Sequence, residues 1–277
     1  MTIGIVGLGL IGGSMAKSIR RGTDNRVLGT DINEETMIMA RMSGAIDGDL
    51  TDEKIPECDL IMVAIPPRAI LKWAEEKAPL LKGVLVLDLC GVKREICGRL
   101  TKLAEENGFS YLGGHPMAGK EVSGFANASV DLFWGASMIL TPDEHTDIQM
   151  LDMLKTLFTK VGFNHITFTT PEEHDRIIAY TSQLAHVTSS AYVKSPTAQK
   201  QMGFSAGSYK DMTRVAKLDE NLWTELFMAN ADCLTEELRS LIDHLNEYLE
   251  ALETKDAEKL TKLLREGRLL KATAGGN

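Results

Sequence analysis

The sequence GIVGLGLIGGS, residues 4–14, contains the pattern Gly-x-Gly-x-x-Gly at Gly7, Gly9 and Gly12. An apolar run typical of a buried strand precedes the glycines. The residues that follow, 11–22, are amphipathic, as expected of a helix that covers a sheet. This stretch therefore predicts a strand, a tight turn and a helix, which together begin a βαβ unit.

Short apolar runs recur through the first part of the chain and alternate with amphipathic segments. Most runs are apolar on both faces and rich in Val and Ile, which is typical of a parallel sheet with helices on both sides. The runs cover residues 3–8, 26–31, 58–66, 83–89, 109–114 and 136–141. We therefore expect a Rossmann-type, mostly parallel sheet domain over residues 1–168.

The pattern changes at Pro171, where proline followed by Glu172 and Glu173 predicts the start of a helix. The predicted long helices cover residues 172–193, 221–253 and 256–271. The fold class expected from the whole sequence is α/β, with the sheet domain followed by an all-helical C-terminal domain over residues 169–277.

The glycine pattern predicts a dinucleotide site because Asp31 lies 22 residues after Gly9, at the end of the second apolar run. Gly7 allows the turn, Gly9 lets the backbone approach a pyrophosphate, and Gly12 lets the helix pack closely. The Asp31 carboxylate can accept hydrogen bonds from the ribose hydroxyls. It would repel a 2′-phosphate, which favours NAD over NADP. The cofactor residues expected here are Gly7, Gly9, Leu10, Ile11, Gly12 and Asp31. The alternative is a glycine turn that binds no nucleotide.

A histidine follows the late strand run FSYLGG, residues 109–114. Ligands of open parallel sheets bind beyond the carboxyl ends of the strands, so His115 should stand beside a bound nicotinamide. Gly113 and Gly114 keep bulk away from the site, and Pro116 fixes the backbone after the histidine. Because imidazole titrates near neutral pH, His115 is a candidate general base. The alternative is a histidine that only caps a turn.

The composition restricts the class of partner. The net charge of −9 argues against nucleic acid, and no run approaches the roughly 20 apolar residues of a membrane span. The four cysteines form no Cys-x-x-Cys pair, so we expect no metal site and no disulfide framework. We expect no secretory signal at the N-terminus and a cytoplasmic location.

A local basic cluster nevertheless offers an anion site. Lys210, Arg214 and Lys217 have the spacing i, i+4, i+7 and would share one face of a helix. An arginine can hold a carboxylate through two parallel hydrogen bonds, so a small anionic substrate is expected. The alternative is a solvated helix face on which Asp211 pairs with Arg214.

Three segments together resemble the prephenate and arogenate dehydrogenases of tyrosine biosynthesis: GLGLIGGS (7–14), GGHPMAGKEVSG (113–124) and SYKDMTRVA (208–216). The resemblance implies NAD-dependent oxidative decarboxylation of prephenate, a dicarboxylate, to 4-hydroxyphenylpyruvate. Conversion of arogenate to tyrosine is the alternative. A hydroxy-acid dehydrogenase or imine reductase, and a regulator that binds NAD without turnover, are more distant alternatives.

The resemblance also implies roles for particular residues. His115 would bind the substrate's ring hydroxyl as the catalytic residue, and Arg214 would hold a carboxylate, with Lys210 one turn earlier. His186 and Glu121 match further substrate residues. Taken alone, His186 is typical of a packed histidine. We interpret His174 as structural and Trp223 as equally compatible with a core, interface or site position. A homodimer through the C-terminal helices is expected, as in relatives.

One segment departs from the family pattern. Many relatives carry Asp-x-Gly-Ser-x-Lys, whereas residues 88–93 here read DLCGVK, so Gly91 replaces the serine and Cys90 precedes it. We expect a water molecule in place of the missing hydroxyl, because a thiol is a weak hydrogen-bond partner. Gly91 and Pro66, which ends the run 58–66, are the remaining candidates for the cofactor site.

Overall fold

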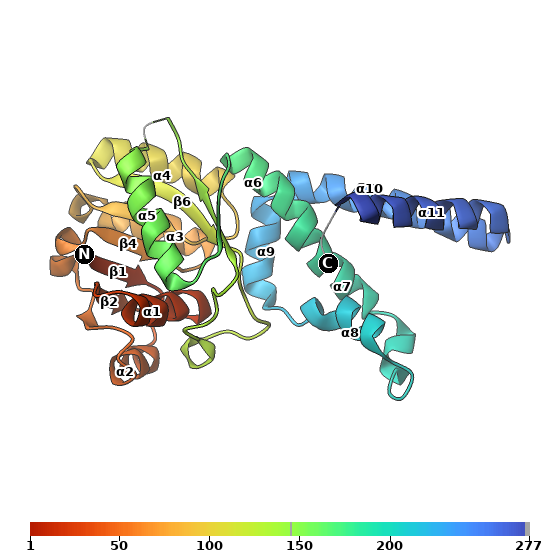
Figure 1. Cartoon of the computed structure of the whole chain (residues 1–277), viewed down its shortest axis with the longest axis horizontal. Helices are drawn as coiled ribbons and strands as arrows, with labels where there is room; N and C mark the ends of the chain where they lie inside the picture. Colours follow the sequence, from red (N-terminus) through yellow and green to blue (C-terminus); the bar gives the residue numbers. More distant parts are fainter. Residues whose placement is uncertain (145, 275–277) are drawn as a thin grey trace. The chain divides into compact units, whose positions relative to one another are not determined.

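A sheet of eight strands runs through the computed structural model, which describes residues 1–144 and 146–274 (Figure 1). The strand order is β3-β2-β1-β4-β5-β6-β7-β8. Neighbours from β3 to β6 are parallel, β7 is antiparallel to β6, and β8 is parallel to β7. The strands are β1 Thr2–Val6, β2 Arg26–Thr30, β3 Gly48–Asp49, β4 Leu60–Val63, β5 Leu85–Asp88, β6 Ser110–Pro116, β7 Ser137–Thr141 and β8 His165–Phe168. The predicted mostly parallel sheet is confirmed.

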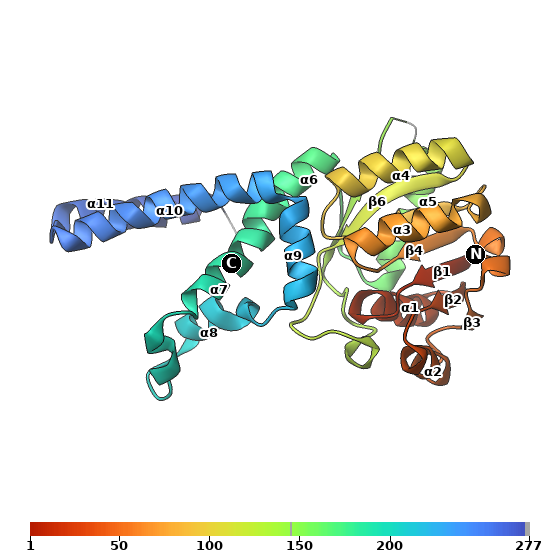
Figure 2. The ribbon, with the colours of Figure 1, turned by 180° about the vertical axis from the view of Figure 1, so that it is seen from behind.

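Helices cover both faces of this sheet. Helices α1 and α5 lie together on one face, and α3 and α4 lie together on the other, as the front and back views show (Figures 1 and 2). The helices of this part are α1 Leu10–Gly22, α2 Glu34–Met42, α3 Pro67–Lys77, α4 Arg94–Asn107 and α5 Ile148–Val161. Short 3₁₀ segments are η1 Asp52–Glu57, η2 Ala78–Leu80, η3 Phe125–Asn127 and η5 Pro196–Lys200.

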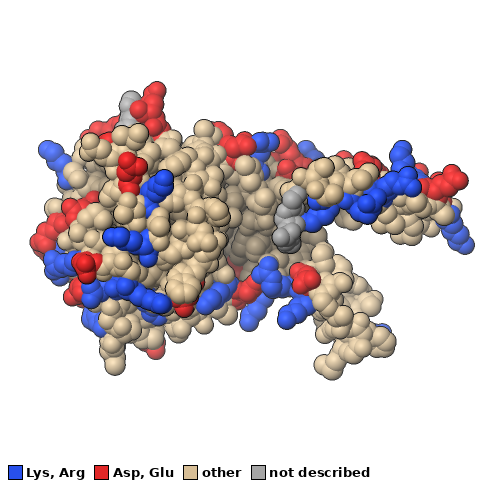
Figure 3. Space-filling view, viewed as in Figure 1, with Lys and Arg blue, Asp and Glu red and all other residues tan. Residues whose placement is uncertain are grey.

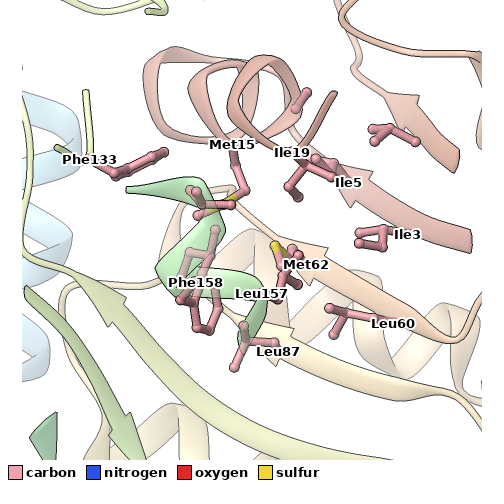
Figure 4. Packing of buried hydrophobic residues seen from close by; sticks show 14 of the residues in the cluster. Ile3, Ile5, Met15, Ile19, Leu60, Met62, Leu87, Phe133, Leu157 and Phe158 are labelled. Carbon is pink, nitrogen blue, oxygen red and sulfur yellow. The ribbon is translucent and has the colours of Figure 1, made fainter. Parts of the chain in front are cut away.

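The strands are apolar on both sides because each side faces a helical layer. In β4, Leu60 and Met62 belong to the core under α1 and α5, whereas Ile61 and Val63 belong to the core under α3 and α4. Figure 4 shows the first of these cores, in which side chains of α1 and α5 meet those of the strands: Met15, Ile19, Leu157, Phe158, Ile3, Ile5, Leu60, Met62 and Leu87. Each fully buried aliphatic side chain contributes about 1.5–3 kcal/mol.

The strand that carries the candidate histidine is longer than the sequence suggests. We expected His115 directly after the strand, but β6 runs to Pro116, and His115 pairs with Ile139 of the antiparallel β7. On the other side of β6, Gly114 allows close approach to the end of β5, since a Cβ there would lie 2.8 Å from the Asp88 carbonyl oxygen. The histidine therefore stands on a hydrogen-bonded strand rather than on a loop.

Helices follow from Pro171, as predicted. The helix expected over residues 172–193 is α6 Pro171–Ile178, a π-helical turn η4 Ala179–Gln183, and α7 Leu184–Tyr192. Thr170 caps its start by accepting the Glu173 backbone N–H. The remaining elements are α8 Gly207–Thr213, the 3₁₀ turn η6 Arg214–Ala216, α9 Glu220–Ala229, α10 Ala231–Glu253 and α11 Ala257–Ala274.

Two helix predictions were wrong. The single helix expected over 221–253 is broken at Asn230, whose backbone leaves the helical region (φ −127°, ψ 30°) because its buried amide bonds to other elements. The regular helix expected from Lys210 to Lys217 ends at Thr213, so Arg214 begins a 3₁₀ turn and Lys217 is extended. The three basic residues therefore do not share one α-helical face.

The chain divides into two compact units, Met1–Asn230 and Ala231–Asn277, of which the last three residues lie outside the described part. In the second unit, α10 and α11 form a hairpin joined by hydrogen bonds such as Tyr248 Oη to the Leu263 carbonyl oxygen (3.3 Å). The boundary expected between residues 168 and 169 stays a prediction. Among the described helices, none is long and apolar enough to cross a membrane.

Candidate active site

The glycine loop between β1 and α1 has a steric need for two of its glycines, Gly7 and Gly12. Gly7 has a φ of +84°, a left-handed conformation that favours glycine. A Cβ on Gly12 would lie 1.8 Å from the Gly7 carbonyl oxygen, whereas a Cβ on Gly9 would meet open space. No side chain caps the start of α1 at Gly9, so the N–H groups of Leu10 and Ile11 can face an anion. The loop therefore fits a pyrophosphate.

Asp31 follows β2 and lies beside this loop. Its Oδ2 accepts the Leu8 backbone N–H at 2.7 Å, and its Oδ1 accepts that of Asn33 at 2.9 Å. These bonds fix a half-exposed carboxylate with lone pairs left for ribose hydroxyls. Pro66 is exposed at the N-cap of α3, directly after β4. The strand ends thus bring together the residues that a dinucleotide needs.

His115 is held from one side by a second histidine. Its Nδ1 lies 2.9 Å from Nε2 of His174 on α6. Burial is the main reason why the pKa of His115 lies well below its usual range, and the positive charge of Lys93 lowers it further. The imidazole is therefore neutral near pH 7 and can accept a proton. Its other nitrogen, Nε2, faces Gly91, where an added Cβ would lie 3.7 Å away.

His174 is itself bonded to the next residue, since its Nδ1 lies 2.7 Å from Asp175 Oδ1. Both side chains are almost completely enclosed, with 0% and 1% of their surfaces exposed. The sequence interpretation of His174 as structural missed this contact with His115. A local signal existed, because His174 and Asp175 occupy the buried face of an amphipathic helix together with Ile178.

A buried ion pair supports the segment after β5. Lys93 Nζ donates to Asp88 Oδ1, both side chains are fully enclosed, and Tyr111 Oη donates to Asp88 Oδ2 at 2.7 Å. Burial alone lowers the pKa of Lys93, but Asp88 and the thiols of Cys90 and Cys97 outweigh it and raise the pKa. Lys93 is therefore a cation that fixes this segment and keeps His115 unprotonated.

Gly91 leaves space where the family has a serine. A Cβ there would make ordinary contacts, 3.5 Å to Leu226 Cδ2 and 3.7 Å to His115 Nε2. Burial raises the pKa of the neighbouring Cys90 thiol to about 12, so this sulfur stays protonated. Gly91 itself supplies no hydroxyl beside His115 Nε2.

The predicted substrate residues form a second group. Arg214 donates to Glu121 Oε1, and both side chains are partly exposed. His186 donates from Nδ1 to the Ser182 carbonyl oxygen (2.9 Å) and stacks on Trp223 with ring centroids 3.7 Å apart. Burial is the main cause that lowers the pKa of His186. The nearby Arg214 lowers this pKa further, whereas Glu121 raises it. Lys210 lies exposed one turn before Arg214.

Helix α9 connects the two groups. Leu226 contacts the position of Gly91, beside His115, and Trp223 stacks on His186. Residues three apart on a helix lie on adjacent turns of one face. The neutral His115 and the group around Arg214 therefore lie along one face of α9 within the unit formed by residues 1–230.

Comparisons with known proteins identify this arrangement. The family model described as prephenate dehydrogenase, nucleotide-binding domain, matches residues 15–167, and the model of the dimerization domain matches residues 170–266. Prephenate dehydrogenase of Bacillus subtilis is 30% identical over 275 residues, which cover 95% of this chain and 73% of that protein.

Solved structures agree over almost the whole chain. A prephenate dehydrogenase from Aquifex aeolicus, in complex with hydroxyphenyl propionate and NAD⁺, has a TM-score of 0.84 at 29% identity, covering 99% of this chain and 98% of that one. Arogenate dehydrogenase of Synechocystis has a TM-score of 0.82 at 26% identity, covering 99% and 100%. With both halves matched in order, the chain belongs to the prephenate dehydrogenase family.

Proposed function

We propose that this chain catalyses the NAD-dependent oxidative decarboxylation of prephenate to 4-hydroxyphenylpyruvate in tyrosine biosynthesis. The observation that carries the proposal is the neutral His115, fixed on β6 with Nδ1 against His174 and Nε2 toward the space over Gly91. Family membership and the NAD⁺-bound relative supply the substrate class and the cofactor.

In this mechanism Nε2 of His115 accepts the proton of the substrate's ring hydroxyl. NAD, when bound at the glycine loop, would supply the acceptor for the hydride that leaves the carbon carrying this hydroxyl. The ring carboxylate leaves as carbon dioxide, and its electron pair enters the ring, which becomes aromatic. His115 can then return its proton to the phenolate oxygen, so the residue is neutral again after each turnover.

The charged residues have separate tasks. Arg214 binds a substrate carboxylate after its guanidinium turns from Glu121, and Lys210 adds a second positive charge one turn earlier. His186 lies beside this pair and offers its Nε2 as an acceptor, because its Nδ1 donates to Ser182. At the other end of the site, Asp31 accepts the adenosine ribose hydroxyls and disfavours the extra phosphate of NADP. Gly7, Gly9, Leu10, Ile11 and Gly12 face the pyrophosphate, and Pro66 and Gly91 line the remaining cofactor site.

Arogenate is the second candidate substrate. It differs from prephenate by an ammonium group in place of a keto group, and Glu121 supplies a carboxylate beside Arg214 that can attract an ammonium. The Synechocystis arogenate dehydrogenase resembles this chain closely in structure. Removing the Glu121 charge should therefore lower turnover of arogenate more than that of prephenate if arogenate binds there.

We also propose that the protein is a homodimer formed through its C-terminal helices. Exposed leucines and an isoleucine recur at helical spacing on α10: Ile242, Leu245, Leu249 and Leu252. Such an apolar stripe is typical of a helix that packs against a partner. The match of residues 170–266 to the family's dimerization domain supports this assignment. A cytoplasmic location belongs to the same proposal.

The proposal is tested by incubating purified protein with each combination of prephenate or arogenate and NAD or NADP. We expect NADH formation, followed by absorbance at 340 nm, to be fastest with prephenate and NAD. Faster turnover of arogenate would establish the second candidate. NAD binding without turnover of either substrate would instead favour a nucleotide-sensing regulator.

A further inference from the structure

We propose that His174 and Asp175 form a positioning pair that fixes the tautomer and orientation of His115, so that its lone pair stays on Nε2. The inference deepens the function proposed above, because it concerns the residue assigned as the base. It does not require the identity of the substrate, since the tautomer exists in the free protein.

The chain of hydrogen bonds from Asp175 through His174 to His115 determines where each proton lies. An ionised carboxylate only accepts, so Asp175 Oδ1 requires the proton of His174 on Nδ1, 2.7 Å away. Nε2 of a neutral His174 is then bare and accepts a proton from its neighbour at 2.9 Å. His115 must therefore carry its proton on Nδ1, which leaves Nε2 free to accept one from a substrate hydroxyl.

This chain of hydrogen bonds needs an ionised Asp175 and a neutral His174, and the surroundings favour both states. Burial raises the pKa of Asp175, but hydrogen bonds from His174 and from the backbone N–H groups of Arg94 and Lys93 outweigh it and leave the carboxyl ionised. Burial lowers the pKa of His174 more than Asp175 raises it, so this imidazole is neutral. A doubly protonated His174 would instead donate to His115 and reverse the tautomer.

The pair is built into the fold from several sides. Asp175 Oδ1 also accepts the Lys93 N–H at 2.7 Å, and Oδ2 accepts the Arg94 N–H at 2.9 Å. The Asp175 carbonyl oxygen accepts Asn230 Nδ2 at 2.8 Å, which joins α6 to the end of α9. The carboxylate thus caps the start of α4, where no residue of α4 supplies a side-chain cap. Such fixation leaves His174 little freedom to turn.

Gly91 explains why the pair matters in this chain. Gly91 lies beside His115 Nε2, 3.7 Å from where its Cβ would be, and has no side chain that could orient the ring from that side. His174 contacts the ring at Nδ1, on the opposite side. The pair therefore supplies an orienting contact that Gly91 cannot supply.

The tautomer is tested directly by ¹⁵N nuclear magnetic resonance of the full chain labelled at histidine. The variants are His174→Phe, which fills the site without an acceptor, and His174→Gln, which restores one near Nε2. His165→Gln, at an exposed histidine of β8, is the control. The His115 signals are assigned by their absence in His115→Asn.

In the wild-type protein and in His165→Gln we expect one His115 nitrogen at the shift of a protonated Nδ1 and the other at that of a bare Nε2. His174→Phe should lose this preference, and His174→Gln should keep most of it. If His174→Phe does not fold, the smaller His174→Leu replaces it. A protonated Nε2 in the wild-type protein, or an unchanged tautomer in the Phe or Leu variant, overturns the proposal.

Kinetics then separate positioning from a merely structural role. His174→Phe should lower kcat at least about tenfold, toward the ~10²–10⁴-fold loss of a missing base, with the KM values of NAD and substrate changed less than about twofold. His174→Gln should recover most of kcat. Unchanged kcat in a folded His174→Phe contradicts the proposal. Absence of all turnover in the wild-type protein would contradict the proposed function while the tautomer experiment still stands.

Discussion

At the scale of single residues, the chemistry depends on keeping one imidazole uncharged. We propose that His115 acts in its neutral form, because burial and the nearby cation Lys93 both oppose its protonation. A carboxylate in direct contact with His115 would instead raise the pKa of this histidine. His115 would then be protonated before the substrate binds. Asp175 acts one residue further away, where it orients without charging the ring.

Replacing His115 by Asn removes the base and keeps a polar side chain of similar reach. Because general-base catalysis is worth about 10²–10⁴-fold, kcat should fall by that factor. Steady-state kinetics with saturating NAD measure the effect, and an unaltered kcat would remove His115 from the mechanism.

Replacing Arg214 by Gln should raise the KM of the substrate. A hydrogen bond to a charged group is worth about 1.5–3 kcal/mol, which corresponds to roughly 10- to 150-fold. kcat should change less, because the carboxylate is bound in the ground state as well as in the transition state. Lys217→Gln, on an exposed residue past the 3₁₀ turn, is a matched charge control. Equal KM values in both variants would argue against the carboxylate contact.

The sequence allowed prediction of residues that act within one short stretch of chain. It did not allow prediction of residues that act through contacts between distant segments. Gly7, Gly12 and Asp31 could be placed because a turn and its following acid lie close together in the chain. The partnership of His115 and His174 spans 59 residues and depends on how α6 docks against β6. No periodicity in either segment encodes that docking, so His174 seemed structural.

At the scale of elements, the packing of α1 against the loop before it is the tightest constraint near the cofactor site. Gly12→Ala places a Cβ 1.8 Å from the Gly7 carbonyl oxygen, so the loop or the helix must shift. We expect weaker NAD binding and a lower free energy of unfolding. Calorimetric titration with NAD and chemical denaturation measure the two effects.

Gly98→Ala is the control for that variant, because Gly98 lies in α4 with open space around its Cβ position. Alanine lowers the conformational entropy of the unfolded chain and favours the helix, so stability should rise by about 0.4–1 kcal/mol. NAD affinity should stay the same. A loss of stability in Gly98→Ala comparable to that in Gly12→Ala would contradict the steric explanation.

The helix α6–η4–α7 shows why element boundaries were less predictable than element types. Twelve residues separate His174 from His186, which in a regular helix rotates the second about 120° from the first. The π turn at Ala179–Gln183 takes up about one extra residue, which leaves only about 20°. Both histidines can then serve one side of the helix, although the sequence of this turn carries no π signal.

At the scale of the whole molecule, the buried histidines make stability depend on pH. The pKa values of His115 and His174 are lowered in the folded protein, so below about pH 6.5 the unfolded chain binds more protons than the folded one. The free energy of unfolding should therefore fall as the pH drops from about 7 to 5, by up to about 1.4 kcal/mol per pH unit for each histidine.

Urea denaturation at a series of pH values measures this dependence. His174→Phe should show a shallower decline, because one of the two groups is missing. The pKa of the Asp175 carboxyl is also lowered in the folded protein, so in the wild-type protein this group contributes only at more acidic pH. A flat profile between pH 7 and 5 in the wild-type protein would show that these histidines titrate freely.

The oligomeric state is the other property of the whole molecule. The chain has a mass of 30.4 kDa, so a dimer weighs 2 × 30.4, about 61 kDa. Light scattering should report this value, and replacing Leu245 and Leu249 by Glu should shift it toward the monomer. A wild-type species of one chain mass would exclude the dimer.

Lys93 gives the protein an internal reporter of its own opening. Its ammonium group is fully enclosed against Asp88, so an acylating reagent can reach it only when the segment after β5 swings away from the sheet. Mass spectrometry would compare the acetylation rate of Lys93 with that of the exposed Lys102. The ratio of the two rates would measure how often the segment opens. Slower acetylation of Lys93 in the presence of NAD would show that the bound nucleotide makes opening of this segment rarer.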